Sequence, residues 1–474
     1  MSAPGFDVCA PDLPTPGTTT LLEASAGTGK TWTIGALVTR YVVEGTARLD
    51  DMLVVTFGRA ASQELRERVR TQLVEAERAL AGDPDVPADT DLLRLVVGDG
   101  DDRELRHRRV LEALAGFDGA TIATTHQFCA LVLESLGVAG DTDARARLVE
   151  DLDDLLREVV DDLYLRAFAY ADADPVFSHA DALAIARAAV GDPQARLEPA
   201  DADPATPAGR RVAFAQAVRD ELDLRKRRLG VLSYDDLLLQ LARALEAPGS
   251  PARTRMQERW QLVLVDEFQD TDPVQWQVLD RAFTGVATMV LIGDPKQAIY
   301  AFRGGDVTTY LQAARSADRH ETLGVNWRSD AALLEATQAL LAGAELGDEQ
   351  IVVHPVSAHH QQRRLVGAPV EAPLRLRAVR RDSLGRGPGT SLAVGQVRPH
   401  VARDLALDVR RLLASGATFE GRELEPRDVA VISYRHADLA AAQRALVEAG
   451  VPAVIAGGGS VFATPAAVEW LSLL

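Results

Sequence analysis

Lysine is almost missing from this 474-residue chain: of its 51 Lys and Arg residues, only Lys30, Lys226 and Lys296 are lysines. A bias of this strength towards arginine is typical of a GC-rich coding sequence, so each remaining lysine invites a specific explanation. Lys30 and Lys296 fall within motifs described below. Lys226 belongs to the basic run 225–228, which either decorates a helix or contacts backbone phosphate.

Cysteine and long apolar runs are also scarce. The two cysteines, Cys9 and Cys129, are too few for a disulfide framework or a four-cysteine metal cluster. No apolar run reaches the roughly 18 residues of a membrane-spanning helix, and the amino terminus lacks the basic and apolar regions of a signal peptide. We therefore expect a cytoplasmic protein in a reducing compartment, with no membrane partner.

Positive charge is outnumbered, since the formal net charge is −18 at pH 7. Such a balance disfavours a polyanionic partner. The excess is concentrated, however, because residues 141–203 hold 16 acidic residues against six arginines, so a DNA-binding groove can lie elsewhere. The length and the 47% hydrophobic content favour a globular protein of about three domains.

Four short apolar runs, at 20–22, 53–57, 262–265 and 289–292, predict strands buried on both faces of a parallel sheet. Polar residues follow each run, at the edge where open α/β folds bind ligands. Helical spacing over 148–163 predicts a helical insertion, and after about 325 a second α/β unit is expected, with a helix over 331–341 and a strand over 429–432. We interpret His354, His359 and His360 as a solvated loop and not as a metal site.

A candidate phosphate-binding loop lies between the first expected strand and a helix expected over 32–43. Its glycines let backbone N–H groups surround phosphate oxygens at a helix N-terminus. We expect Lys30 to reach the β and γ phosphates of ATP and Thr31 to bind Mg²⁺; a flexible turn is the alternative. The cofactor-binding residues of this run are Ala24, Ser25, Ala26, Gly27, Thr28, Gly29, Lys30 and Thr31.

Paired carboxylates follow the strand expected at 262–265. Asp266 is predicted to hold Mg²⁺ and Glu267 to orient or deprotonate the attacking water, both as catalytic residues. Alone, such a pair is more often a solvated turn. Together with the phosphate-binding loop, it predicts hydrolysis of ATP.

Residues 266–271, Asp-Glu-Phe-Gln-Asp-Thr, resemble motif II of superfamily 1 helicases in the branch that contains UvrD and RecB. Four further segments are similar to motifs Ia (55–61), Ib (125–129), III (293–304) and IV (326–329). The residues at 22–31 and 294–297 favour the RecB type in its actinobacterial form. So does Phe302, where UvrD-like enzymes usually carry Trp. Gly58 replaces the Thr usual in motif Ia.

The resemblance implies roles for individual residues. Gln297 senses the γ-phosphate, Arg328 contacts it and Trp327 stacks on adenine; the alternative for Arg328 is to cap a helix. Phe302 stacks on a DNA base, a contact that tolerates any sequence, or is a core aromatic. Three further positions are implied as DNA contacts: Thr56, Phe57 and His126, of which His126 could equally be a buried histidine.

The expected fold is an α/β, RecA-like P-loop motor domain (1–134 and 230–325) with a helical insertion (135–229) and the first part of a second RecA-like domain (326–474). ATP is expected between the two. The resemblance implies an ATP- and Mg²⁺-dependent 3′-to-5′ helicase that acts on single-stranded and duplex-end DNA in break repair, with RecC-like and RecD-like partners. The alternatives are a solitary UvrD-type helicase, or a chain that binds nucleotide or DNA without turnover. Motifs V and VI are not found, so little activity is expected of the chain alone.

Overall fold

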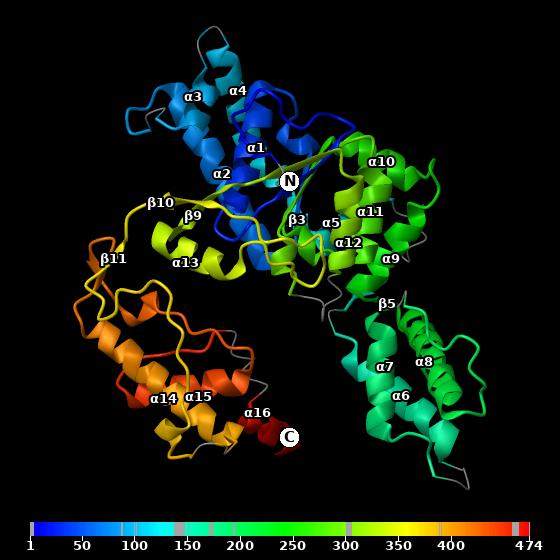
Figure 1. Ribbon diagram of the computed structural model, residues 1–474. Coiled ribbons are helices and arrows are strands. Elements are labelled where there is room, and N and C mark those ends of the chain that lie inside the picture. Colours follow the sequence, from blue (N-terminus) through cyan, green and yellow to red (C-terminus); the bar gives the residue numbers. More distant parts are fainter. Residues whose placement is uncertain are drawn as a thin grey trace. The chain divides into compact units, whose positions relative to one another are not determined.

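The computed structural model describes residues 4–86, 89–98, 100, 102–136, 147–149, 151–169, 174–192, 195–299, 306–387, 389, 391–456 and 464–473. The chain divides into two compact units, each considered by itself: Met1–Asn326 with Gly343–Val356, and Trp327–Ala342 with Ser357–Leu474 (Figure 1). Within the described residues, no helix is both long and apolar enough to cross a membrane.

The first unit contains a six-stranded parallel sheet with the order β3-β2-β6-β7-β1-β8. Four strands confirm the predicted apolar runs: β1 (Thr19–Glu23), β2 (Met52–Thr56), β6 (Leu262–Val265) and β7 (Thr288–Gly293). The edge strands β3 (Thr121–Thr124) and β8 (Arg319–Thr322) were not predicted, because each has only four residues and includes polar ones. β7 lies between β1 and β6, so the residues after β7 follow a strand that lies between the strand of the phosphate-binding loop and the strand of the paired carboxylates.

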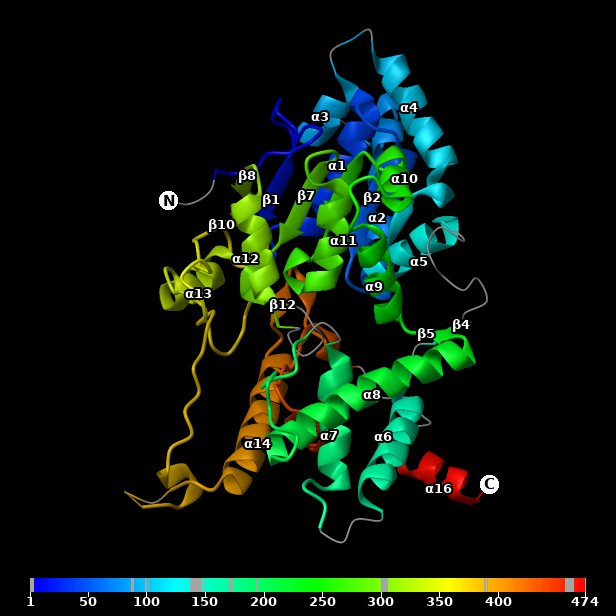
Figure 2. The ribbon, with the colours of Figure 1, turned by 90° about the vertical axis from the view of Figure 1, so that its right-hand side faces the viewer.

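Helices cover both faces of this sheet and give the unit three layers (Figure 2). Side chains alternate along the strands, so that Leu22 and Leu264 face one layer while Leu21 and Val265 face the other. The first layer holds α1 (Lys30–Glu44), α2 (Arg59–Ala81), α3 (Asp91–Val97) and α4 (Arg103–Ala115). The second holds α5 (Thr125–Leu136), α9 (Tyr234–Ala244), α10 (Pro251–Arg259), α11 (Pro273–Phe283) and α12 (Val307–Ser316).

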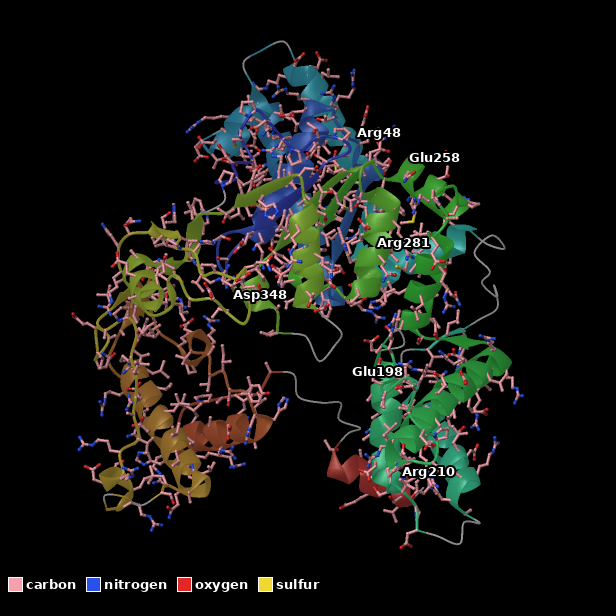
Figure 3. All side chains as sticks on the ribbon, turned by 45° about the vertical axis from the view of Figure 1, so that its right-hand side comes forward. Arg48, Glu198, Arg210, Glu258, Arg281 and Asp348 are labelled. Carbon is pink, nitrogen blue, oxygen red and sulfur yellow. The ribbon has the colours of Figure 1, made fainter. Side chains whose placement is uncertain are left out.

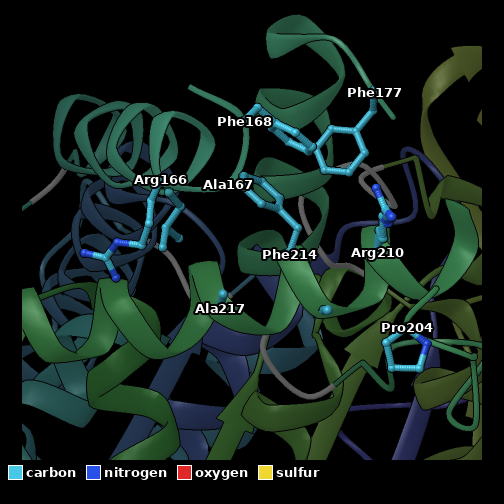
Figure 4. Close-up of a pocket in the computed structure, with 10 residues that line it drawn as sticks. Arg166, Ala167, Phe168, Phe177, Pro204, Arg210, Phe214 and Ala217 are labelled. Carbon is cyan, nitrogen blue, oxygen red and sulfur yellow. The ribbon is translucent and has the colours of Figure 1, made fainter. Parts of the chain in front are cut away.

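Between β3 and β6 lies the helical insertion, which consists of α6 (Asp153–Phe168), α7 (His179–Gly191) and α8 (Pro207–Leu229). It has its own apolar core, and β4 (Arg147–Leu148) pairs with β5 (Val231–Leu232). A hollow of about 410 Å³ lies beside Phe168, Phe177 and Phe214 (Figure 4). Arg210, which also lines it, is an exposed residue of α8 (Figure 3).

The basic run 225–228 forms the last turn of α8. Lys226 Nζ lies 2.8 Å from Asp223 and 2.7 Å from Asp236 of α9. Asp236 also closes the capping box that starts α9 after Ser233. Arg225 pairs with carboxylates as well, so these two basic side chains are engaged within the protein.

The second unit begins at Trp327, within β9 (Val325–Asp330), which pairs with β10 (Ser357–His360). Its first helix, α13 (Ala331–Leu341), confirms the predicted helix. A small sheet follows, with β11 (Leu365–Val366), β12 (Thr418–Phe419) and β13 (Arg422–Glu423). The remaining helices are α14 (Val394–Leu413), α15 (His436–Glu448) and α16 (Pro465–Leu473). α14 and α15 pack together over a small apolar core.

Two predictions for the second unit were wrong. Residues 429–432 form no strand, and Ile432 is 94% exposed; within the described residues no strand pairs with this apolar run. The histidines expected in a loop are partly in a strand: His359 and His360 belong to β10, where His359 stacks on Trp327. Across the described residues, no cluster of His, Cys, Asp or Glu forms a metal site.

Candidate nucleotide site and DNA-binding edge

The predicted phosphate-binding loop connects β1 to α1 in the first unit. Gly27 and Gly29 have φ values of 80° and 90°, a region that side-chain-bearing residues rarely occupy, and α1 begins directly after Gly29. Thr28 is tied down by its hydroxyl, which donates to Ser25 O at 2.7 Å. The first turn of α1 therefore points its free N–H groups into the loop, as a phosphate site requires.

Lys30 is paired with Glu267 across the site. Its Nζ lies 2.5 Å from Glu267 Oε2, which also accepts a hydrogen bond of 2.7 Å from Gln269 Nε2. The two residues predicted to bind phosphate and to activate water are thus brought into direct contact. Because a γ-phosphate attracts the same ammonium, nucleotide and Glu267 compete for Lys30.

The backbone of Glu267 is in the left-handed region, with φ 50° and ψ 43°. Such a conformation is unfavourable for a side-chain-bearing residue by about 1–2 kcal/mol. It is held by the two contacts of the side chain and by the Glu267 N–H, which donates to Asp266 Oδ1 at 3.0 Å. The strained turn fixes Glu267 towards Lys30, and Asp266 in place at the end of β6.

Asp266 fits a magnesium ligand. It is 8% exposed, and burial together with the Glu267 carboxylate raises its pKa to about 7. A carboxyl group in such a place gains most from a nearby cation. Thr31, in the first turn of α1, offers the hydroxyl that would share the ion with Asp266 and phosphate oxygens, since Mg²⁺ favours few protein ligands.

Residues after β7 extend the site. Gln269 Oε1 accepts from Asp294 N at 2.9 Å, and Gln297 Nε2 donates to Asp294 Oδ2 at 2.7 Å. Gly293 makes room for this arrangement, since a Cβ there would lie 2.8 Å from Gln269 Oε1. One chain of polar contacts therefore runs from Lys30 through Glu267, Gln269 and Asp294 to Gln297, the predicted γ-phosphate sensor. Gln269 and Asp294 had no predicted role, although both lie within the segments that resemble helicase motifs.

A second cluster forms at the ends of β2 and β3. Arg59 Nη2 donates to the Tyr234 hydroxyl at 2.8 Å, and the rings of Tyr234 and His126 meet edge to face at 5.3 Å. Burial lowers the pKa of His126, which favours its neutral form. Phe57 is half-buried, whereas Thr56 is 1% exposed and its hydroxyl has no partner in the described part of the chain. The role of Thr56 as a DNA contact stays a prediction, and its side chain lies beneath the surface here.

Tyr234 was missed by the sequence analysis. Its signal was present, because Ser233 and Asp236 have the spacing of a capping box and place an aromatic residue at the first position of a helix. What the spacing does not reveal is that α9 starts beside the ends of β2 and β3.

Three predicted residues are not placed at the nucleotide site or the second cluster by the structure. Phe302 lies outside the described residues. Trp327 and Arg328 belong to the second unit, in which the 54% exposed Trp327 ring stacks on His359 at 4.0 Å. Their neighbour Asn326 belongs to the first unit, where its Nδ2 donates to Ala26 O of the phosphate-binding loop at 2.8 Å.

A parallel sheet with a candidate phosphate-binding loop and a strand-end Asp-Glu pair is the arrangement of the RecA-like P-loop class. Residues 11–318 match the UvrD/REP helicase N-terminal domain. The chain therefore belongs to the UvrD/REP helicase family, as its motifs predicted.

Known relatives place it near one subunit type. The chain is 57% identical to the RecBCD enzyme subunit RecB of Mycolicibacterium smegmatis, over 99% of this chain and 43% of that protein. The Mycobacterium tuberculosis RecB is 54% identical over the same shares, and the Escherichia coli RecB is 26% identical over 96% of this chain and 49% of that protein. The chain thus spans less than half the length of these relatives.

Proposed function

We propose that this chain is the nucleotide-hydrolysing motor part of a RecB-like, ATP-dependent DNA helicase that processes double-strand break ends in the cytoplasm. The observation that carries the proposal is the Lys30–Glu267 contact of 2.5 Å, which joins the phosphate-binding loop to the water-activating carboxylate. The family and the RecB relatives support it. The proposed partners are single-stranded and duplex-end DNA with RecC-like and RecD-like subunits, and the proposed direction is 3′ to 5′.

The chemistry assigned to the first unit uses its own side chains. Lys30 leaves Glu267 and neutralises the β and γ phosphates, while Thr31 and Asp266 hold Mg²⁺, which stabilises charge on the transferred phosphoryl group. Glu267, released from Lys30, orients the water and accepts its proton. Ala24, Ser25, Ala26, Gly27, Thr28 and Gly29 supply the backbone around the phosphates.

Further roles rest on the family resemblance. Gln297 is proposed to report the γ-phosphate, with Arg328 as a second contact to it and Trp327 as the ring that stacks on adenine. Thr56, Phe57, His126 and Phe302 are proposed as DNA contacts. The proposed domain division remains 1–134 with 230–325, 135–229 and 326–474.

The test is steady-state phosphate release with Mg-ATP, with and without single-stranded DNA. Because little activity is expected of the chain alone, we expect slow turnover that DNA stimulates and that Lys30→Ala removes. Calorimetry with Mg-ATP is run in parallel. Binding that depends on Lys30, without turnover in either condition, supports instead a chain that grips nucleotide without hydrolysing it.

The second cluster makes a separate prediction about DNA. Tyr234→Ala should weaken binding of single-stranded DNA about tenfold, because one aromatic stacking contact contributes about 1–3 kcal/mol. The affinity for nucleotide should stay within about twofold of wild type, since the Tyr234 side chain contacts Arg59 and His126, which lie outside the nucleotide site. Fluorescence anisotropy with a labelled oligonucleotide measures the change.

Two variants control this experiment. Tyr234→Phe keeps the ring and removes only the hydroxyl that Arg59 reaches, so it should retain most of the DNA affinity. Tyr434→Ala removes a tyrosine that is 99% exposed in the second unit. Equal losses for Tyr234→Ala and Tyr434→Ala would argue against a DNA contact at Tyr234.

A further inference from the structure

The three lysines of the chain share one environment. Lys30, Lys226 and Lys296 each have a side chain that is 12% exposed, and each ammonium lies within 3 Å of at least one carboxylate. A compact ammonium with three rotatable donors fits such a site better than the planar fork of arginine. The proposed function gives Lys30 a role in phosphate binding, but it gives Lys296 none.

Lys296 connects the ends of two neighbouring strands. Its Nζ lies 2.6 Å from Glu23 Oε1 and 2.8 Å from Asp294 Oδ1. Glu23 ends β1 immediately before the phosphate-binding loop, and β1 pairs with β7 so that Glu23 is opposite Gly293. Burial opposes the charge of Lys296, but the carboxylates of Asp294 and Glu23 outweigh it and raise the pKa of Lys296. The ammonium therefore stays charged.

Asp294 divides its two oxygens between different donors. Oδ1 receives Lys296 through both its ammonium and its backbone N–H, the latter at 3.1 Å, while Oδ2 receives Gln297 Nε2 at 2.7 Å. A carboxylate accepts only, so this contact fixes which end of the Gln297 amide carries the N–H groups. The second N–H of the same amide is then left to meet another acceptor.

Asp294 is 2% exposed, and a buried carboxylate without a partner charge is unfavourable. We infer that Lys296 is a positioning residue for the γ-phosphate sensor: by holding Asp294 as an oriented carboxylate, it orients the Gln297 amide, and through Glu23 it ties that sensor to the start of the phosphate-binding loop. This inference rests on the proposed function, and it adds a pair of charges, Lys296 with Asp294, that decides how well the site distinguishes ATP from ADP.

The test measures nucleotide discrimination, which requires no turnover. Calorimetry with Mg²⁺ gives the affinities of the chain for ATPγS and for ADP, and their ratio reports the γ-phosphate contact. Lys296→Met should lower the ratio about fivefold, the fold-change that one net hydrogen bond provides. Gln297→Ala should lower it by a similar factor.

The double variant separates positioning from general damage. If Lys296 acts through Gln297, adding Lys296→Met to Gln297→Ala should change the ratio by less than about twofold. The inference would be overturned if the losses of the two single variants multiply in the double variant. It would also be overturned if Lys296→Met leaves the ATPγS-to-ADP affinity ratio unchanged, or if that ratio is one in wild type. Lys226→Met is the matched control, because it removes a lysine of equal exposure with two carboxylate partners in the helical insertion and its vicinity. Its ratio should equal that of wild type.

Folding is checked by thermal unfolding of each variant. If Lys296→Met does not fold, Lys296→Met with Asp294→Asn removes both charges together, and the same fivefold loss is expected; an unchanged ratio overturns the inference. Wild-type protein that binds no nucleotide, or binds it equally well with Lys30→Ala, contradicts the proposed function. Binding that needs Lys30 but ignores Lys296 contradicts only the role of Lys296.

Discussion

Lys30→Ala is expected to weaken binding of Mg-ATP by at least about 100-fold and to remove hydrolysis. Charge-assisted hydrogen bonds to phosphate contribute about 1.5–3 kcal/mol each. The variant loses the Lys30 ammonium, which is expected to contact both the β and the γ phosphate. The structure adds a second reason: without Lys30, the Glu267 carboxylate loses its 2.5 Å partner and repels the γ-phosphate from the same place.

Isothermal titration calorimetry in the presence of Mg²⁺ measures this loss directly. Lys226→Ala is the matched control, since its side chain is equally exposed and also pairs with carboxylates, two where Lys30 has one, but belongs to the helical insertion. We expect its affinity for Mg-ATP to match that of wild type. Equal affinities for wild type and Lys30→Ala would show that residues 24–31 are a flexible turn and not a phosphate-binding loop.

The nucleotide site could be predicted from sequence because its signals are local. The glycines of the loop, the apolar run of β6 and the Asp-Glu pair that follows it each require a residue type at a fixed spacing. Their meeting is not local. It depends on β7 lying between β1 and β6, which brings Asp294 next to Gln269 and Lys296 next to Glu23. The spacing of residues along the chain does not reveal this strand order.

Burial and pairing are properties of the assembled unit, which local sequence does not reveal. Thr56 resembles a DNA contact in sequence, a role that stays a prediction, and at the end of β2 it is only 1% exposed. Residues 429–432 have the composition of a strand, but in the part of the chain that the structure describes no strand pairs with them. Tyr234 gains its importance from helix α9 starting beside His126, about a hundred residues away in the chain.

The lysines show how a sequence anomaly acquires a physical cause. A near absence of lysine suggested that the three exceptions are special, and two of them were already within motifs. The structure extends this to Lys226, which joins α8 to the capping box of α9. Lys226 and Lys296 each hold an ammonium between two carboxylates, and Lys30 pairs with one; a compact ammonium suits these sites better than the planar guanidinium of arginine.

Glu267→Gln should separate binding from chemistry. Loss of the general base is expected to slow hydrolysis about 10³-fold, within the usual contribution of such a group. Binding should change in the opposite direction: the amide no longer holds Lys30 as an ion pair, so Lys30 is free for phosphate, and affinity for Mg-ATP should rise about fivefold, which corresponds to roughly 1 kcal/mol for a partly exposed pair. The expected affinity for Mg-ATP therefore decreases from Glu267→Gln through wild type to Lys30→Ala.

Calorimetry gives the affinities, and phosphate release with single-stranded DNA gives the rates. Glu420→Gln is a fitting control, because Glu267 and Glu420 are the two side-chain-bearing residues with positive φ in the described ranges, and both pair with a basic side chain. Glu420 lies in the second unit, so its variant should leave affinity and rate unchanged. If Glu267→Gln binds Mg-ATP more weakly than wild type, Glu267 supports the nucleotide and does not compete with it for Lys30; if hydrolysis persists at the wild-type rate, another group must activate the water.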